Sequence, residues 1–394
     1  MFPNVPKIIL PFQLTLIIIL LLYNACKSKK SSSEDLLLKS IDSIMQVHNI
    51  PAASFGVIRN GKIQMAQALG RIRFDDSIKA NEDDLFHIGS NTKSITSWIA
   101  GRLVLQDKIA WDTKFFETIP ELKEYAQPDY YDMTLQDLLS HKTGITSFKN
   151  RNQWPTIENA YQKYKPQNQE ETRLAIIKQA LQEKPVKLDK EKPYQYSNIG
   201  YICAAIMLER TSGKSWENLL YELNEDLGLN FKIGWPKYHG INQPRGHMKA
   251  LKDTLSTERI FGLIPDRLEN NEFWQDYVFV CRPSGDLSVN VTDFLKFLDV
   301  VINAKLFKDK TNKEIAKHIL NNQMGWGKHY QFNSNYYDAA GSLVTFNSIA
   351  AIIENEKMGV VVMVNSGESE ASKGMFEIKS ILEEHYLDLK LSNN

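Results

Sequence analysis

Cysteine is scarce in this chain, which has three in 394 residues. Three cysteines cannot build the disulfide framework on which small secreted domains depend. Net charge is absent as well, because 47 Lys and Arg side chains balance 47 Asp and Glu side chains. That balance argues against a protein that coats nucleic acid. Gly and Pro number only 20 and 14, too few for a collagen-like or disordered chain. A folded globular protein remains.

Metal-ligand spacings are lacking too. The eight histidines contain no His-x-x-x-His pair, no Cys-x-x-Cys pair occurs, and no Gly-rich phosphate loop is present. The sequence therefore predicts catalysis without a metal or cofactor. Cys203 and Cys281 both stand in apolar surroundings, so we expect buried thiols there and not a disulfide.

The N-terminus carries a targeting pattern. Lys7 precedes an apolar run, Ile8–Ala25, which is followed directly by Cys26 and a polar stretch. A charged start, an apolar segment and a small residue describe a secretory signal; a transmembrane anchor of barely sufficient length is the alternative. The Ala25–Cys26 junction resembles the lipobox of bacterial lipoproteins, although Tyr23 stands where Leu is usual. The resemblance implies a signal peptide over residues 1–25, lipidation of Cys26, a polar tether over 26–36, and anchoring in the cell envelope. Lys27 favours the outer membrane by the same resemblance.

The remaining chain, residues 37–390, is expected to form one α+β domain. Asn60–Gly61 lies between two apolar runs and is a strong hairpin signal. A second hairpin is predicted from Thr345–Ile353 and Gly359–Val364. The region between these ends has mostly helical spacing, as does a C-terminal helix over residues 373–384. These patterns predict an antiparallel sheet that is built from both chain ends and flanked by helices. Residues 150–192 are polar and charged and are predicted to be a surface excursion.

One candidate catalytic pair is Ser90 and Lys93. Residues three apart on a helix share a face, so the amine can reach the hydroxyl. A serine hydroxyl becomes nucleophilic when a neighbouring base takes its proton, and a lysine with a lowered pKa can be that base. The pair alone is weak evidence, since an N-cap serine beside an exposed lysine would look the same.

A second candidate group is Tyr196 and Asn198 in the segment YQYSNIG. A phenol there could relay a proton, and the amide could hold a substrate amide and orient Lys93. A packed aromatic residue before a helix capped by Ser197 or Asn198 is the structural alternative.

Several segments, in this order, resemble the serine β-lactamase-like hydrolases, the group of class C β-lactamases, D-alanyl-D-alanine carboxypeptidases, D-aminopeptidases and many esterases. They are residues 85–96 (LFHIGSNTKSIT), 138–145 (LLSHKTGI), 196–201 (YSNIGY), 283–288 (PSGDLS) and 324–327 (MGWG). The resemblance implies a β-lactamase/transpeptidase-like fold, Ser90 as an acylated nucleophile, and Lys93 with Tyr196 as general bases.

The family's third motif is Lys or His, any residue, then Gly. Here the corresponding residues are Ala339–Ala340–Gly341, so the cation is missing. A methyl group can neither raise the local positive potential nor bind a carboxylate. The backbone part of the motif stays, and the Ser342 N–H is expected to pair with that of Ser90 as an oxyanion hole. The sequence therefore favours a neutral ester or amide over substrates that need a cation.

Three residues could be taken for replacements of the missing function. Lys142 belongs to a literal Lys-Thr-Gly, but it precedes the tyrosine motif and cannot be the strand motif. His329 and Arg282 could bring charge from elsewhere; we interpret them as a surface histidine and a structural arginine. A separate candidate is His141, which could be taken for the base of a Ser-His pair; it has no acidic partner visible by spacing and is interpreted as structural.

The sequence thus predicts a lipid-anchored serine hydrolase that cleaves a small-molecule or peptide-like ester or amide. The alternative is a catalytically impaired family member that serves in binding or envelope maintenance. True β-lactamase or D-Ala-D-Ala carboxypeptidase activity is a lesser alternative. No nucleic-acid partner is expected, and the sequence does not indicate an oligomeric state.

Overall fold

The computed structural model describes residues 33–147, 159–160, 162–166, 168–251, 259–263 and 281–387. The predicted signal peptide, Cys26 and residues 388–390 of the predicted domain lie outside these ranges. Residues 33–47 are helical, so this first helix begins inside the segment assigned to the tether. In the part of the chain that is described, no helix has both the length and the apolar character needed to cross a bilayer.

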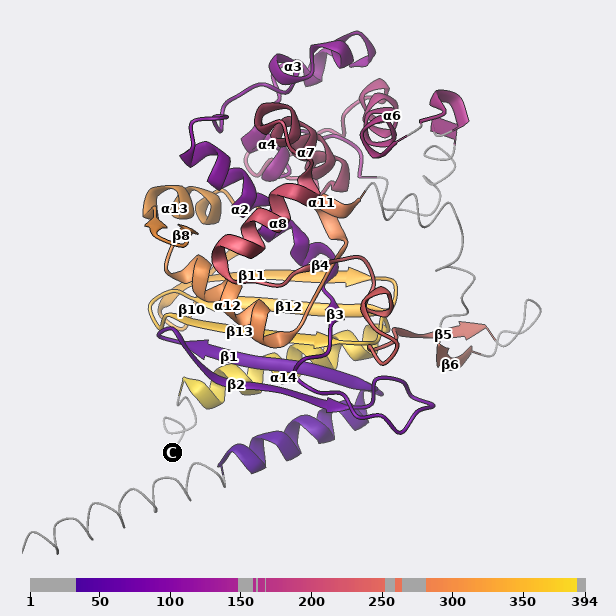
Figure 1. Cartoon of the computed structure of the whole chain (residues 1–394), viewed down its shortest axis with the longest axis vertical. Coiled ribbons are helices and arrows are strands. Elements are labelled where there is room, and N and C mark those ends of the chain that lie inside the picture. Colours follow the sequence, from indigo (N-terminus) through magenta and orange to yellow (C-terminus); the bar gives the residue numbers. More distant parts are fainter. Residues whose placement is uncertain are drawn as a thin grey trace, which may run out of the picture.

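A six-stranded sheet joins the two ends of the chain (Figure 1). Its order is β10-β11-β12-β13-β1-β2, and every neighbouring pair is antiparallel. The strands are β1 (Ala52–Arg59), β2 (Lys62–Gly70), β10 (Gly327–Gln331), β11 (Ser334–Leu343), β12 (Phe346–Ile353) and β13 (Met358–Val364). β1 pairs with β13 along its length, because both strands are apolar on both faces and need neighbours on each side.

Both predicted hairpins are confirmed. β1 and β2 meet at Asn60 and Gly61, whose φ angles of 51° and 75° are those that a two-residue type I′ turn requires. β12 and β13 form the second hairpin, in register from Asn347↔Val364 to Ile353↔Met358. The α+β fold predicted from the chain ends is therefore the fold observed.

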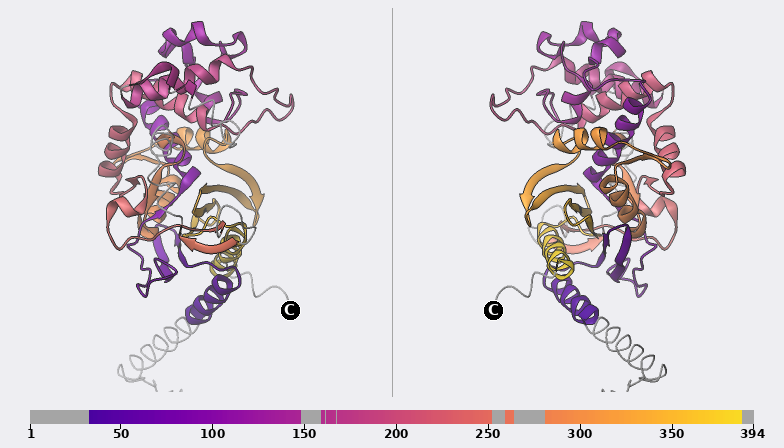
Figure 2. Two further views of the ribbon diagram at one scale, coloured as in Figure 1. Left: turned by 90° about the vertical axis from the view of Figure 1, so that its right-hand side faces the viewer. Right: turned by 90° about the vertical axis from the view of Figure 1, so that its left-hand side faces the viewer.

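Helices cover both faces of the sheet (Figures 1 and 2). α12 (Val291–Ile302) packs on β1 and β13 from one side, and α14 (Ser369–Tyr386) packs on β12 and β13 from the other. The helical region above the sheet in Figure 1 contains α2 (Thr92–Leu105), α3 (Phe115–Thr118), α4 (Leu135–Leu139), α6 (Gln169–Gln182), α7 (Asn198–Ser212), α8 (Trp216–Leu227), α11 (Arg282–Gly285) and α13 (Lys313–Asn321). Shorter strands are β3 (Phe86–His87), β4 (Lys232–Ile233), β5 (His247–Leu251), β6 (Arg259–Leu263), β7 (Leu287–Val289), β8 (Lys305–Phe307) and β9 (Lys310–Thr311).

Two hydrophobic cores result. The larger lies between the sheet and the helical region and includes Trp98 of α2 and Phe294 of α12. The smaller lies under the opposite face, where Leu37 and Ile41 of the first helix and Ile378 of α14 are buried. Burying apolar area on both faces fixes the sheet firmly, so residues at its edge have a rigid support.

One sequence prediction was wrong in part. The stretch 150–192 was predicted to be a surface excursion, but its helix α6 packs into the larger core. The residues of α6 that belong to this core are Ile176, Ile177, Ala180 and Leu181. Charged residues before this apolar stripe concealed the helical spacing. Residues 150–158 of the same stretch lie outside the described ranges.

Candidate active site

Ser90 lies on a sharp turn between a strand and a long helix. β3 ends at His87, a 3-10 turn spans Gly89–Asn91, and α2 begins at Thr92. Gly89 has a φ of +49°, which favours glycine, and its N–H donates to Nδ1 of His87 at 3.1 Å. The Ser90 side chain therefore stands at the N-terminal end of α2, where unpaired backbone N–H groups collect.

The turn is anchored by a buried pair behind it. His87 is wholly buried, and its Nε2 lies 3.2 Å from Oδ1 of Asp286. Because Nδ1 accepts the Gly89 N–H, the ring proton is on Nε2 and is donated to the carboxylate. Burial raises the pKa of Asp286, and the hydrogen bond from His87 partly offsets that rise. This pair holds the ring of His87, and with it Gly89, directly before Ser90.

Lys93 lies one helical turn from Ser90 and reaches three acceptors. Its Nζ donates to Oδ1 of Asn198 at 2.8 Å, to the carbonyl oxygen of Ser284 at 2.6 Å, and to Oγ of Ser90 at 3.5 Å. Three acceptors match the three N–H bonds of an ammonium group. The side chain is buried at 2% exposure, so its position is set by these contacts.

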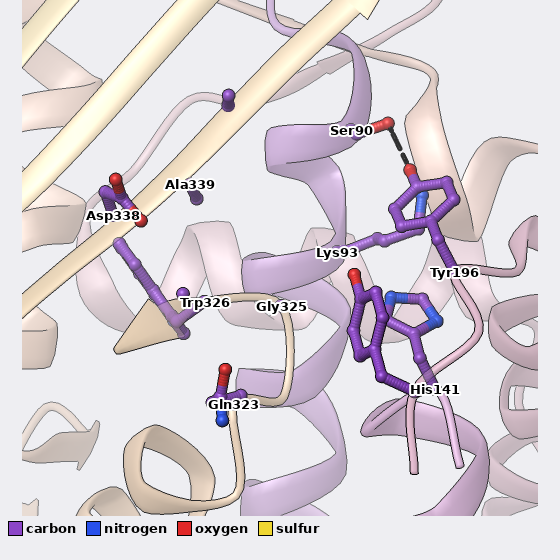
Figure 3. A pocket seen from close by; sticks show the side chains of 12 residues that line it. Ser90, Lys93, His141, Tyr196, Gln323, Gly325, Trp326, Asp338 and Ala339 are labelled. Atoms are coloured by element: carbon purple, nitrogen blue, oxygen red, sulfur yellow. Dashed lines mark hydrogen bonds between the residues drawn. The ribbon is translucent and has the colours of Figure 1, made fainter. Parts of the chain in front are cut away.

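Tyr196 comes from a distant segment and touches the same serine. Its phenol oxygen lies 2.6 Å from Oγ of Ser90, and its ring centroid lies 4.7 Å from Nζ of Lys93 (Figure 3). The next residue, Ser197, caps α7 by accepting the N–H of Gly200. Of the two caps considered from the sequence, Ser197 is the one observed, and it fixes the segment that carries Tyr196.

His141 packs beside Tyr196 as a structural residue. Its Nδ1 accepts the backbone N–H of Ser197 at 3.1 Å, and its ring centroid lies 4.8 Å from that of Tyr196. Burial, with a smaller contribution from the charge on Lys93, lowers the pKa of His141 to about 3. The imidazole is therefore neutral at physiological pH and positions the Tyr196 segment.

β11 crosses the turn at very close range. A Cβ atom on Gly341 would lie 1.9 Å from the carbonyl oxygen of Ile88, and one on Gly89 would lie 2.7 Å from the Ser342 nitrogen. Ser348 on β12 tightens this contact, because its hydroxyl donates to the Ile88 oxygen at 2.8 Å. The predicted oxyanion residues are thus beside the Ser90 turn, and both glycines are required by the approach.

Neither Arg282 nor His329 replaces the cation that is missing from β11. Ala339 is 7% exposed. Arg282 points to Glu217 at 3.3 Å and Asp286 at 3.7 Å, which confirms its structural role. His329 is 58% exposed and faces Asp338 at 3.3 Å, as expected for a surface histidine.

Two cavities meet at the serine. One of about 230 Å³ extends along β11 toward Trp326 and Asp338, and one of about 460 Å³ extends past Ser342 toward α14. Ser90, Tyr196 and Ala340 line both. Figure 3 shows the smaller one, with the Ser90–Tyr196 contact on one side and Asp338 on the other. A substrate can therefore extend in two directions from the nucleophile.

Comparisons with known proteins agree with this fold. Residues 38–378 match the family model described as Beta-lactamase. The chain belongs to the beta-lactamase family. It is a serine hydrolase of that family.

Among sequence relatives, the teichoic acid D-alanine hydrolase of Staphylococcus aureus (strain MRSA252) is 26% identical over 336 residues, which is 85% of this chain and 75% of that protein. Among solved structures, an octameric penicillin-binding protein homologue from Pyrococcus abyssi matches with a TM-score of 0.68 at 19% identity, covering 88% of this chain and 77% of that one. D-amino acid amidase from Ochrobactrum anthropi SV3 matches with a TM-score of 0.67 at 17% identity, covering 89% and 99%. These structural likenesses support the fold.

The structure brings together every predicted catalytic or oxyanion residue that lies in the described chain. Ser90, Lys93, Tyr196, Asn198, Gly341 and Ser342 all lie at one cleft. Sequence reasoning missed the carbonyl of Ser284 and the carboxylate of Asp338. The position of a backbone carbonyl cannot be predicted from the sequence. Asp338, in contrast, stands directly before Ala339, so its charge beside the motif could be recognised from the sequence.

Two expectations about other residues can be compared with the structure. Cys203 and Cys281 are both buried, as their apolar surroundings in the sequence predicted. In the described ranges, no group of three His, Cys, Asp or Glu side chains is arranged to hold a metal ion.

Proposed function

We propose that this chain hydrolyses an ester or amide through an acyl-enzyme on Ser90, and that its substrate does not need a carboxylate. The observation that carries the proposal is a complete Ser90–Tyr196–Lys93 cluster beside a strand that has Ala339 in place of a cation. The cluster supports acyl transfer, whereas the strand lacks the group that would bind an anionic substrate end.

In this proposal the proton of Ser90 passes to Tyr196. The 2.6 Å contact between their oxygens is the shorter of the two contacts that the hydroxyl makes with possible bases, since Lys93 is at 3.5 Å. The positive charge of Lys93, held by Asn198 and Ser284, stabilises the negative charge that develops on the phenol oxygen. Tyr196 then returns the proton to the leaving group.

The two backbone N–H groups of Ser90 and Ser342 receive the oxyanion in this proposal. They do not depend on the identity of any side chain, so replacing the family's cation by Ala339 leaves them intact. Attack by Ser90 forms the acyl–oxygen bond and breaks the bond to the alcohol or amine. Water then attacks the ester and gives a proton to Tyr196; the bond between the acyl carbon and Ser90 breaks, the acid leaves, and Tyr196 returns the proton to Ser90.

The substrate class follows from the relatives. They are named for the hydrolysis of D-alanine from teichoic acid and of D-amino acid amides. In both kinds of substrate the carboxyl carbon of the amino acid is the atom attacked, so no free carboxylate is present there. We propose a small D-aminoacyl ester or amide for this chain, in the cell envelope and reached through the lipid anchor at Cys26.

A fluorophosphonate probe and a chromogenic acetate ester test the nucleophile. Wild-type protein should gain the mass of one probe adduct and hydrolyse the ester, whereas Ser90→Ala should do neither. Ser380→Ala is a matched control, because Ser380 is exposed on α14 and bonds to a backbone carbonyl only. Equal behaviour of wild type and Ser90→Ala would contradict the proposal and favour a binding protein without chemistry.

A further inference from the structure

The cavity beside the nucleophile carries an acid one residue before the position at which the family carries a cation. Among the described residues that line either cavity, Asp338 is the one carboxylate. It directly precedes Ala339 on β11, and its side chain is 31% exposed. The sign of the charge on this part of the strand is therefore opposite to that of a lysine or histidine motif.

The positive charge of Lys93 does not cancel the negative charge of Asp338 for a substrate group that enters the cavity. Lys93 is the other charged residue that lines the cavity, but its three N–H bonds point to Asn198, Ser284 and Ser90. It is buried at the bottom of the site, whereas Asp338 lies at the far side of the cavity (Figure 3). A substrate group that enters along β11 therefore meets a negative charge.

The neighbouring side chains suit the same kind of ligand. Trp326, Tyr194 and Tyr196 also line this cavity, and the faces of aromatic rings attract cations. The cavity of about 230 Å³ has room for a group of several heavy atoms, because one water occupies about 30 Å³ of liquid. Its chemistry fits a small ammonium group.

His329 is the other titratable group that faces Asp338 from the neighbouring strand. Its Nε2 lies 3.3 Å from Oδ1 of Asp338, and it is exposed to solvent. A protonated imidazole there would reduce the negative charge. Wild type and variants are therefore compared at one and the same pH.

We propose that Asp338 is a specificity-determining residue that selects substrates with a positively charged ammonium group close to the scissile bond. This inference rests on the proposed function, since it concerns the ester or amide attacked by Ser90. It deepens that function, because it assigns the residue that recognises the ammonium group of the proposed D-aminoacyl substrate. The carboxylate attracts a cation that reaches the cavity and repels a carboxylate there.

Isosteric ester pairs with a fixed charge test this inference. One pair varies the alcohol, with acetylcholine against 3,3-dimethylbutyl acetate, and the other varies the acyl group, with betaine ethyl ester against ethyl 3,3-dimethylbutanoate. Each rate is divided by the rate of hydroxide hydrolysis of the same ester. In wild type, the corrected kcat/KM should be at least about tenfold higher for the cationic member of one pair or both (about 1.4 kcal/mol).

Variants at position 338 decide the role of the carboxylate. Asp338→Asn should reduce the cationic preference to about threefold or less, and Asp338→Glu should restore most of it. Asp132→Asn removes the same charge at an exposed position, 88% accessible and paired with Lys114, and should keep the wild-type preference. Fluorophosphonate labelling of Ser90 reports whether each variant retains an assembled site.

Failure of this inference and failure of the proposed function would give different results. Hydrolysis of the neutral esters shows that the proposed function stands. The inference is then overturned if wild type has no preference for the cationic esters, or if Asp338→Asn keeps the wild-type preference. If no ester is hydrolysed and Ser90 takes no probe, the proposed function fails and the inference falls with it.

Discussion

The hydroxyl oxygens of Ser90 and Tyr196 lie 2.6 Å apart although 106 positions separate them in the chain. Ser90 is held by the turn before α2, and Tyr196 is held by the capped start of α7. Each oxygen is therefore fixed by its own helix, and their approach depends on the packing of α2 against α7. Such pre-positioning of a nucleophile and a base is what general-base catalysis requires.

The first prediction concerns that contact. Tyr196→Phe removes the phenol oxygen and keeps the ring that packs on His141, so kcat for a chromogenic ester should fall by about 10²-fold or more. Tyr221→Phe, at a tyrosine that is exposed on α8, should retain wild-type turnover. A fall of less than about threefold in Tyr196→Phe would show that Lys93 alone takes the proton.

The second prediction concerns the missing cation. Ala339→His places an imidazole where the family has Lys or His, and it should raise the hydrolysis of an anionic substrate such as a chromogenic cephalosporin by about tenfold or more (about 1.4 kcal/mol). The wild type should hydrolyse this substrate weakly or not at all. Ala339→Leu adds bulk without charge and should give no such rise. An equal effect of both substitutions would mean that charge at this position is irrelevant.

The third prediction is a pH dependence of stability. The pKa of His141 is about 3 in the folded protein and about 6.5 in an unfolded chain. The unfolded state therefore binds one more proton between these values, and the free energy of unfolding falls as the pH falls from about 6.5 toward 3. The stabilisation is fully present above pH 6.5.

Urea unfolding at pH 7 and pH 5 measures this contribution. Between these two conditions, wild type should lose about 2 kcal/mol more than His141→Asn, because that variant lacks the titrating ring. Asn tolerates the φ of +61° found at this position and can still accept the Ser197 N–H. Identical losses in the two proteins would show that His141 is not buried in its neutral form.

The fourth prediction concerns the anchor. Cys26→Ser should move the protein from the membrane fraction to the soluble fraction and abolish the incorporation of labelled palmitate, because the thiol of Cys26 is the proposed point of lipid attachment. Cys281→Ser serves as the control, since Cys281 is buried in the folded domain. Membrane retention of Cys26→Ser would instead favour an uncleaved apolar segment over residues 8–25.

The sequence could predict much of this protein because several signals are local. The turn at Asn60–Gly61 identifies a hairpin by itself, since few residues adopt positive φ, and the spacing of Ser90 and Lys93 identifies a shared helix face. The order of the motifs indicated the family, and Ala339 marked the departure from it. α6 was missed because its apolar stripe is short and follows charged residues.

What the sequence determined by itself is which chemical groups are present and which is missing. Only the tertiary structure decided what those groups do together. A hydrogen bond between Ser90 and Tyr196, or a carbonyl of Ser284 facing Lys93, depends on segments far apart in the chain. Their approach results from burial of the α2, α7 and α11 surfaces against one another. Such burial depends on all three helices and cannot be predicted from the sequence of any one of them. The same holds for Asp338, whose place in the cavity follows from the pairing of β10 with β11.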